Sequence, residues 1–209
     1  MTTAQKALLY TFLAFAVLFI ALLPLQPYPG NFVIKAVPAI SLAVLALLAV
    51  SGLKGKLLFM SLLFCATADI ALELPMEMSF MLGLGLFLIA HILLIVTFSR
   101  DFKMQRSRIP VIVLIAIYAV IISIVLTPWL KEMAIPVYIY VIAITLMGIF
   151  AALRAAKNKF TLYGAISFVV SDSIIAINKF MIPVVAADYI IMITYYLALL
   201  LIVYGFLKE

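Results

Sequence analysis

Two aspartates lie deep inside apolar stretches of this chain, where a charged side chain is costly and usually serves a function. Asp69 lies thirteen residues after Lys56, and Asp172 lies thirteen residues after Lys159. At 1.5 Å per residue in a helix, each carboxyl group would lie roughly 20 Å from the membrane surface that the lysines mark. Two carboxyl groups close together at low dielectric tend to share one proton. We therefore predict an Asp69–Asp172 pair that performs acid/base catalysis or proton transfer.

Further polar residues accompany the two aspartates. His91, about 14 Å deep on its helix, could orient an aspartate, relay protons, or simply bridge two helices. Glu73 lies one turn after Asp69 and Lys179 lies two turns after Asp172, so each shares a helix face with its aspartate. Together the polar residues near the outer helix ends would form an outward-facing cavity, although such side chains also commonly snorkel to water. This outer layer consists of Lys35, Glu73, Asn178, Lys179 and Asp188.

Residue types exclude several other chemistries. The chain has one cysteine, Cys65, and one histidine, His91, so an intrachain disulfide, a cysteine zinc site and a three-histidine metal site are excluded. The sequence also lacks the G-x-S-x-G nucleophile elbow, the P-loop and the dinucleotide-binding fingerprint. We therefore predict no metal and no cofactor.

The composition indicates which kind of element positions these residues. Of the 209 residues, 69% are hydrophobic and 11% are charged, with a mean hydropathy of +1.38. A soluble domain is about half apolar and a quarter charged, and a core of this size in water could not hide so much apolar surface. We predict an all-α, polytopic membrane bundle that forms a single integral-membrane domain over residues 1–209.

Eight stretches are long enough to cross the hydrocarbon core, which takes about 20 mostly apolar residues. The breaks between them are short and polar, or rich in proline and glycine, so no loop could hold a soluble domain. We therefore predict eight transmembrane helices. Their ranges are 7–25, 32–50, 57–74, 78–98, 109–126, 134–153, 160–182 and 189–206.

The basic residues predict the orientation of this bundle. If the N-terminus is cytoplasmic, eleven of the fourteen Lys and Arg residues fall on the cytoplasmic side, as the positive-inside rule expects. Both termini should then face the cytoplasm, in the cell (inner) membrane if the source is bacterial. The net charge of +6 is thereby explained without a nucleic-acid partner. The eleven residues are Lys6, Lys54, Lys56, Arg100, Lys103, Arg106, Arg108, Arg154, Lys157, Lys159 and Lys208.

The two halves of the sequence resemble each other. A shift of 103 residues places Asp69 on Asp172 and Lys54 on Lys157, and carries the first four predicted helices roughly onto the last four. Because four is an even number of crossings, the halves would run parallel. The shift therefore indicates a possible parallel 4+4 internal repeat.

Three segments resemble a known family. SLLFCATAD over residues 61–69 and GLGLFLIAH over residues 83–91 resemble the YhhN family of multi-pass membrane proteins, which has an Asp in the third span and an F-L-x-A-H run in the fourth. GAISFVVSDS over residues 164–173 is similar to the family segment G-A-x-x-F-x-x-S-D-S. The chain departs from the pattern at Ala68, where the family pattern has Gly, and at Ala36, where it has Pro, and neither change removes a titratable group.

The resemblance implies an activity. The family includes lysoplasmalogenases, which cleave the vinyl-ether bond of lysoplasmalogens to a fatty aldehyde and glycerophosphoethanolamine or glycerophosphocholine. Asp69 and Asp172 match its essential aspartates, and the implied substrate is a lysophospholipid in the bilayer. Supporting or substrate-binding positions would be Lys35, Glu73, His91, Tyr140, Ser171, Asn178, Lys179 and Tyr195, with Lys35 or Lys179 meeting the substrate phosphate.

Two other classes of function fit the same residues. Paired intramembrane aspartates, a central histidine and a 4+4 repeat also suit a proton-coupled transporter of a small molecule or lipid. A structural or regulatory membrane protein would need both aspartates to be idle. The resemblance places the hydrolase first.

Overall fold

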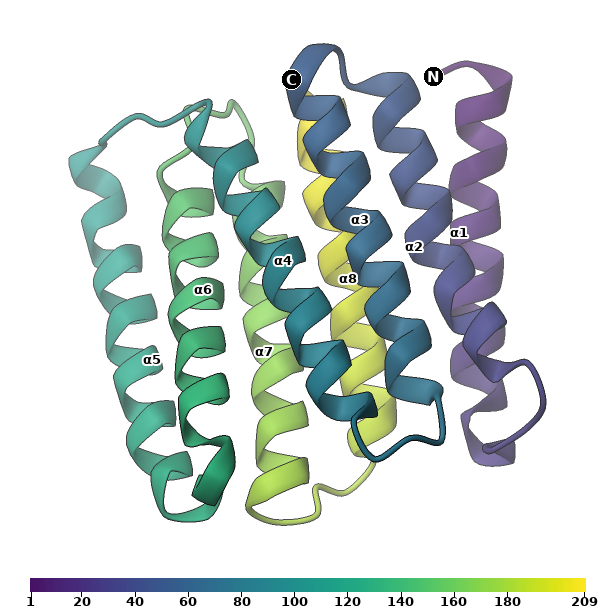
Figure 1. The fold of residues 1–209 in the computed structure, drawn as a ribbon. Helices are drawn as coiled ribbons and strands as arrows, with labels where there is room; N and C mark the ends of the chain where they lie inside the picture. Colours follow the sequence, from purple (N-terminus) through teal and green to yellow (C-terminus); the bar gives the residue numbers. More distant parts are fainter. The chain divides into compact units, whose positions relative to one another are not determined.

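The computed structural model describes residues 1–209, and the chain is all-helical (Figure 1). The α-helices are α1 (Thr3–Leu22), α2 (Asn31–Ala49), α3 (Gly52–Glu73), α4 (Ser79–Ser99), α5 (Ile109–Leu130), α6 (Ala134–Ala152), α7 (Phe160–Phe180) and α8 (Ala187–Leu207). Three short 3-10 helices are η1 (Leu23–Leu25), η2 (Arg106–Arg108) and η3 (Lys131–Met133). The all-α class predicted from composition is confirmed.

Seven helical segments are long and apolar enough to cross a membrane. One of them, Arg106–Ala152, is 47 residues long and contains both α5 and α6. Large apolar side chains on these helices face outward, such as Leu114, Ile124 and Ile135. So many exposed large apolar side chains are compatible with lipid and not with water. The chain is a multi-pass membrane protein.

Three helix boundaries differ from the predicted ranges by four or more residues. The first is the start of α1, which begins at Thr3 instead of residue 7. The third predicted span starts at residue 57, whereas α3 begins at Gly52, because the backbone helix continues through two lysines that a hydropathy window excludes. The fifth predicted span stops at residue 126, whereas α5 continues through Pro128 to Leu130. Pro128 lies in the last turn of α5, where it lacks a backbone donor, and the helix ends two residues later.

The chain divides into two compact units. The first unit is Met1–Thr97 with Phe206–Lys208, in which α2 contacts both α1 and α3 (Figure 1). Ala39, Ala43 and Ala46 of α2 are completely buried, and such small residues let helices approach closely in a membrane protein. α3 is fixed to α4 by Ser61, whose hydroxyl donates to the Ala90 carbonyl at 3.0 Å.

The second unit is Phe98–Gly205 with Glu209, in which α5, α6 and α7 contact one another (Figure 1). Gly164 of α7 lies so close to α8 that a Cβ there would be 2.8 Å from the backbone of Ala198 and Ile202. The hydroxyl of Ser167 donates to the Thr194 carbonyl of α8 at 2.7 Å. This close approach fixes the register of α7, the helix that carries Asp172, against α8.

Candidate functional site

In the first unit, Asp69 lies on a buried face of α3. Its exposed fraction is 2%, and Ser61 and Cys65, on the preceding turns of the same face, are completely buried. This stripe follows from the spacing of four residues, which places side chains above one another on a helix. The structure thus holds the Asp69 carboxyl group inside the protein; its depth in the membrane, inferred from the distance to Lys56, stays a prediction.

Glu73 lies one turn after Asp69 and is the last residue of α3. Its carboxylate forms a network of polar contacts. The Lys35 Nζ atom lies 2.6 Å from Glu73 Oε1, and Asn31 donates from Nδ2 to Glu73 Oε2 at 2.5 Å. Lys35 also lies 5.8 Å from the centre of the Phe19 ring. Both carboxylate oxygens therefore have a donor, and the ion pair joins the start of α2 to the end of α3. Lys35 and Glu73, both predicted for the outer polar layer, lie together.

Two residues beside this ion pair were not predicted from the sequence. Asn31 lies four residues before Lys35 on α2 and therefore shares its helix face, a signal that could have identified it. Tyr28 lies in the loop before α2, and its pKa is raised above the usual 10.0, first by burial and then by the negative charge of Glu73. Asn31 thus belongs to the polar network by a hydrogen bond, and Tyr28 lies near enough to feel the charge of Glu73.

His91 is completely buried on α4. Its Nδ1 atom lies 2.7 Å from the Phe87 carbonyl oxygen one turn earlier. Because a carbonyl oxygen only accepts, this bond assigns the proton to Nδ1. The ring is therefore fixed in orientation by its own helix, inside the first unit.

In the second unit, Asp172 has a hydroxyl partner. Tyr140 of α6 donates from its hydroxyl to Asp172 Oδ2 at 2.5 Å, and the Tyr140 side chain is buried. The neighbouring Ser171 is completely buried and donates to the Ile191 carbonyl of α8 at 3.1 Å. Ser171 therefore positions α7 on α8, whereas Tyr140 contacts the carboxylate itself.

The remaining predicted residues of the second unit have different surroundings. Tyr195 of α8 is buried and packs edge-on against the Phe168 ring at 5.6 Å. Asn178 accepts the Val184 backbone N–H at Oδ1, 2.9 Å away, and so closes the loop between α7 and α8. Lys179 and Asp188 are exposed, Asp188 in the first turn of α8.

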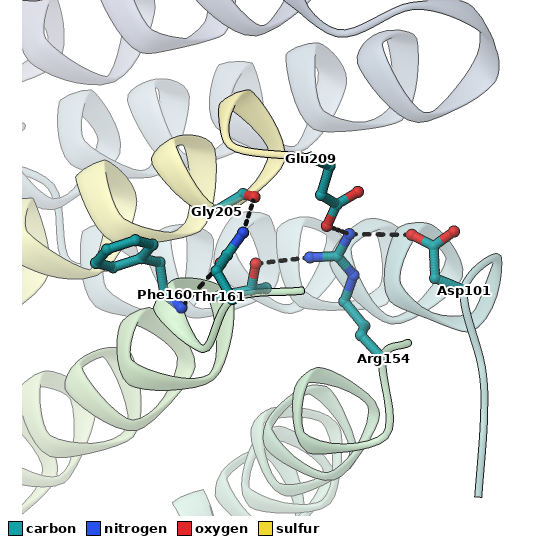
Figure 2. Close-up of polar contacts among 7 residues, drawn as sticks. Asp101, Arg154, Phe160, Thr161, Gly205 and Glu209 are labelled. Carbon is teal, nitrogen blue, oxygen red and sulfur yellow. Dashed lines mark hydrogen bonds and ion pairs between the residues drawn. The ribbon is translucent and has the colours of Figure 1, made fainter. Parts of the chain in front are cut away.

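The structure also buries Arg154. The sequence indicated this residue only as one of the eleven basic residues predicted for the cytoplasmic side. Arg154 is 2% exposed and donates to Asp101 Oδ2 at 3.0 Å, to Thr161 Oγ1 at 2.6 Å and to the Glu209 carboxylate (Figure 2). Its carboxylate partners are more than fifty positions away in the sequence. No local pattern could therefore have indicated them. No three His, Cys, Asp or Glu side chains gather to hold a metal ion.

Comparisons with known proteins identify the family. The model of the YhhN family matches residues 30–206. A protein named lysoplasmalogenase from Mycobacterium bovis (strain ATCC BAA-935 / AF2122/97) is 32% identical over 178 residues, which are 82% of this chain and 68% of the relative. A protein of the same name from Mycobacterium tuberculosis (strain CDC 1551 / Oshkosh) matches with the same identity and coverage. No solved structure matches the chain. The matched residues include α2 to α7, α8 except its last residue, and all ten predicted site residues. The chain belongs to the YhhN family.

Proposed function

We propose that this protein is a membrane hydrolase that cleaves the vinyl-ether bond of lysoplasmalogens with an ethanolamine or choline headgroup. The products would be a fatty aldehyde and a glycerophospho-alcohol. The observation that carries the proposal is the 32% identity to two proteins named lysoplasmalogenase. A lysophospholipid is also the kind of substrate that a multi-pass membrane protein meets within the bilayer.

The proposed reaction needs an acid and a carboxylate. A carboxylic acid transfers its proton to the β-carbon of the vinyl ether, which forms a C–H bond and leaves an oxocarbenium ion on the carbon bonded to oxygen. Water adds to that carbon and loses a proton to the carboxylate. The resulting hemiacetal then separates into aldehyde and alcohol, so the net reaction consumes one water. We assign these roles to Asp69 and Asp172 because two carboxyl groups in a medium of low dielectric divide naturally into one acid and one base.

The surroundings of the two aspartates support an assignment of roles. Tyr140 donates a hydrogen bond to Asp172 Oδ2, and a donated hydrogen bond stabilises an ionised carboxylate. Asp172 would then stabilise the oxocarbenium ion and orient water, and Asp69, which is 2% exposed, would be the acid. Neither role requires a metal or another cofactor.

Other residues would hold the substrate in place. Lys35 or Lys179 would contact the substrate phosphate, because an ammonium group is a compact phosphate partner. Glu73 holds the Lys35 ammonium group at 2.6 Å and so positions it. Four further residues would support the site indirectly, by fixing the helices that carry Asp69 and Asp172. These residues are His91, Ser171, Asn178 and Tyr195.

We also propose the finer architecture: eight transmembrane helices in one membrane domain, both termini in the cytoplasm, and a parallel 4+4 repeat. In a bacterium the protein would lie in the cell membrane. The asymmetric distribution of Lys and Arg supports this orientation. The division of the chain near residue 97, between α4 and α5, supports the repeat.

The activity is tested with purified protein in detergent and 1-alkenyl-lysophosphoethanolamine, by measuring released aldehyde. The matched control substrate is the saturated 1-alkyl ether, which has the same headgroup but no double bond to protonate. In D₂O, proton transfer to carbon predicts one deuterium at C2 of the aldehyde, read by mass spectrometry after reduction to the alcohol. An absence of aldehyde under varied lipid and pH conditions would contradict the proposal.

A proton-coupled transporter is the second candidate, and the two compact units of the chain favour it because many transporters consist of two related halves. Proton-dependent solute flux into liposomes, together with no aldehyde release, would support the transporter over the hydrolase.

A further inference from the structure

Two loops of the second unit, far apart in the sequence, are joined side by side. The segment after α4 and the segment after α6 form an antiparallel β-bridge. The backbone N–H of Lys103 donates to the Leu153 carbonyl at 2.8 Å, and that of Ala155 donates to the Asp101 carbonyl at 2.7 Å. These bonds make the two loops one surface, which we call the paired-loop platform and which comprises residues 99–108 and 153–159.

Arg154 pairs with both acidic side chains beside this surface, whose exposed fractions are 21% for Asp101 and 25% for Glu209. Asp101 is the only acidic residue of the two loops, and Glu209 is the only one in the segment after Gly205. Both carboxylates bind the buried guanidinium group of Arg154 (Figure 2). Arg154 is fixed further by the Thr161 hydroxyl at 2.6 Å and by the Phe98 ring, whose centre is 5.7 Å away. Both nearby carboxylates therefore form ion pairs with Arg154.

The cations of the platform, in contrast, face outward. Five are exposed, Arg108 is half-exposed, and none forms an ion pair. The positive-inside rule accounts for basic residues in these loops. It does not account for the pairing of both nearby carboxylates with the buried Arg154 and not with these cations. The six residues are Arg100, Lys103, Arg106, Arg108, Lys157 and Lys159.

Two apolar side chains lie among these cations in the sequence. Phe102 is 53% exposed and Met104 is 63% exposed. The Phe102 ring is held beside Phe150 of α6, with the ring centres 6.2 Å apart. Exposed apolar groups beside basic residues at the end of a membrane-crossing helix are typical of a surface that enters the headgroup layer.

We propose that the paired-loop platform binds anionic phospholipid headgroups. The phosphates of several lipids pair with the six cations, since Lys and Arg at a membrane surface attract anionic lipids. Phe102 and Met104 enter the boundary between headgroups and acyl chains. A zwitterionic lipid binds less tightly because the cations of the platform repel its positively charged choline group. This inference does not involve Asp69 or Asp172 and does not depend on the proposed hydrolase activity.

The test is a lipid titration of the full-length protein in a neutral detergent. Dimyristoyl-phosphatidylglycerol is added, bound lipids are counted by native mass spectrometry, and dimyristoyl-phosphatidylcholine is the zwitterionic comparison. We expect phosphatidylglycerol to bind about tenfold more tightly. The variant Lys103→Gln/Lys157→Gln should weaken its binding by about fivefold for each cation removed, and added salt should weaken it further.

The matched control is Lys6→Gln/Lys56→Gln, which removes the same charge from α1 and α3 and should leave phosphatidylglycerol binding unchanged. Equal losses in the two variants would show a general effect of net charge and would overturn the proposal. Equal binding of the two lipids would also overturn the proposal. So would competition by soluble glycerophosphoglycerol at the same concentration as the lipid, because such competition indicates a site for free phosphate esters. If the first variant does not fold, Arg106→Gln/Lys159→Gln tests the same surface.

Discussion

The Tyr140 hydroxyl donates a hydrogen bond of 2.5 Å to Asp172 Oδ2. Tyr140 comes from α6 and Asp172 from α7, two helices that contact each other within the second unit. The bond therefore depends on helix packing and fixes one oxygen of the carboxylate. Under the proposed function, it prepares Asp172 for the ionised role.

Tyr140→Phe tests this bond because it removes only the hydroxyl group. A hydrogen bond to a charged group contributes about 1.5–3 kcal/mol, so we expect kcat/KM for aldehyde release to fall about tenfold to a hundredfold. The control is Tyr138→Phe, which removes a hydroxyl that lies 2.7 Å from Thr127 Oγ1. An equal fall in both variants would contradict a specific role of Tyr140.

Lys35 and Glu73 should be coupled in stability. Lys35→Met leaves the partly buried Glu73 carboxylate without its cation, and breaking such a pair costs about 3 kcal/mol of the free energy of unfolding. Lys35→Met/Glu73→Leu removes both charges and should cost less than the single change. Reversible unfolding in mixed micelles measures all three variants, and strictly additive costs would contradict the coupling.

Gly164 should tolerate no side chain. A Cβ there would lie 2.8 Å from backbone atoms of α8, so Gly164→Ala must separate α7 from α8, at about 1–3 kcal/mol. Gly85→Ala is the matched control, because a Cβ at Gly85 meets nothing within 4 Å. Thermal unfolding in detergent should show a lower Tm for the first variant alone. An unchanged Tm for Gly164→Ala would contradict the close approach.

Tyr28 gives the stability a pH dependence. Its pKa in the folded state is raised above 10.0, first by burial and then by Glu73, so the folded protein keeps the phenol proton after the unfolded chain has lost it. This contribution is complete below about pH 10 and is lost as the pH rises further. The Tm of Tyr28→Phe should therefore decline less steeply than that of the wild type above about pH 10. Parallel declines would contradict the assignment.

The helices were predictable because lipid acts as the solvent. A crossing needs about 20 apolar residues whatever the sequence details, so hydropathy alone predicted an all-helical chain with long apolar helices, as the structure shows. The depth of Asp69 in the membrane, inferred from its distance to Lys56, stays a prediction. The extension of α5 through Pro128 was missed, because a proline in the last turn of a helix looks in the sequence like a stop.

The packing and the polar partners were not predictable from the same pattern. α5 is apolar on all sides, so periodicity cannot tell that Leu126 is buried while Ile124 is exposed. Lys35 was expected to reach water or a phosphate, and its contact with Glu73, 38 positions away, depends on how α2 packs on α3. Arg154 likewise has partners more than fifty positions away. Such pairs belong to tertiary structure and leave no local signal.

The most direct test of the central claim, that Asp69 and Asp172 carry an acid/base reaction, is aldehyde release from 1-alkenyl-lysophosphoethanolamine by Asp69→Asn and Asp172→Asn. Each substitution keeps the shape of the side chain and removes its proton chemistry. Because general acid–base catalysis contributes about a hundredfold to ten-thousandfold, each variant should lose activity by at least the lower factor. The exposed Asp188 supplies the control Asp188→Asn, which should stay active. Wild-type rates of aldehyde release in either Asp69→Asn or Asp172→Asn would contradict the account.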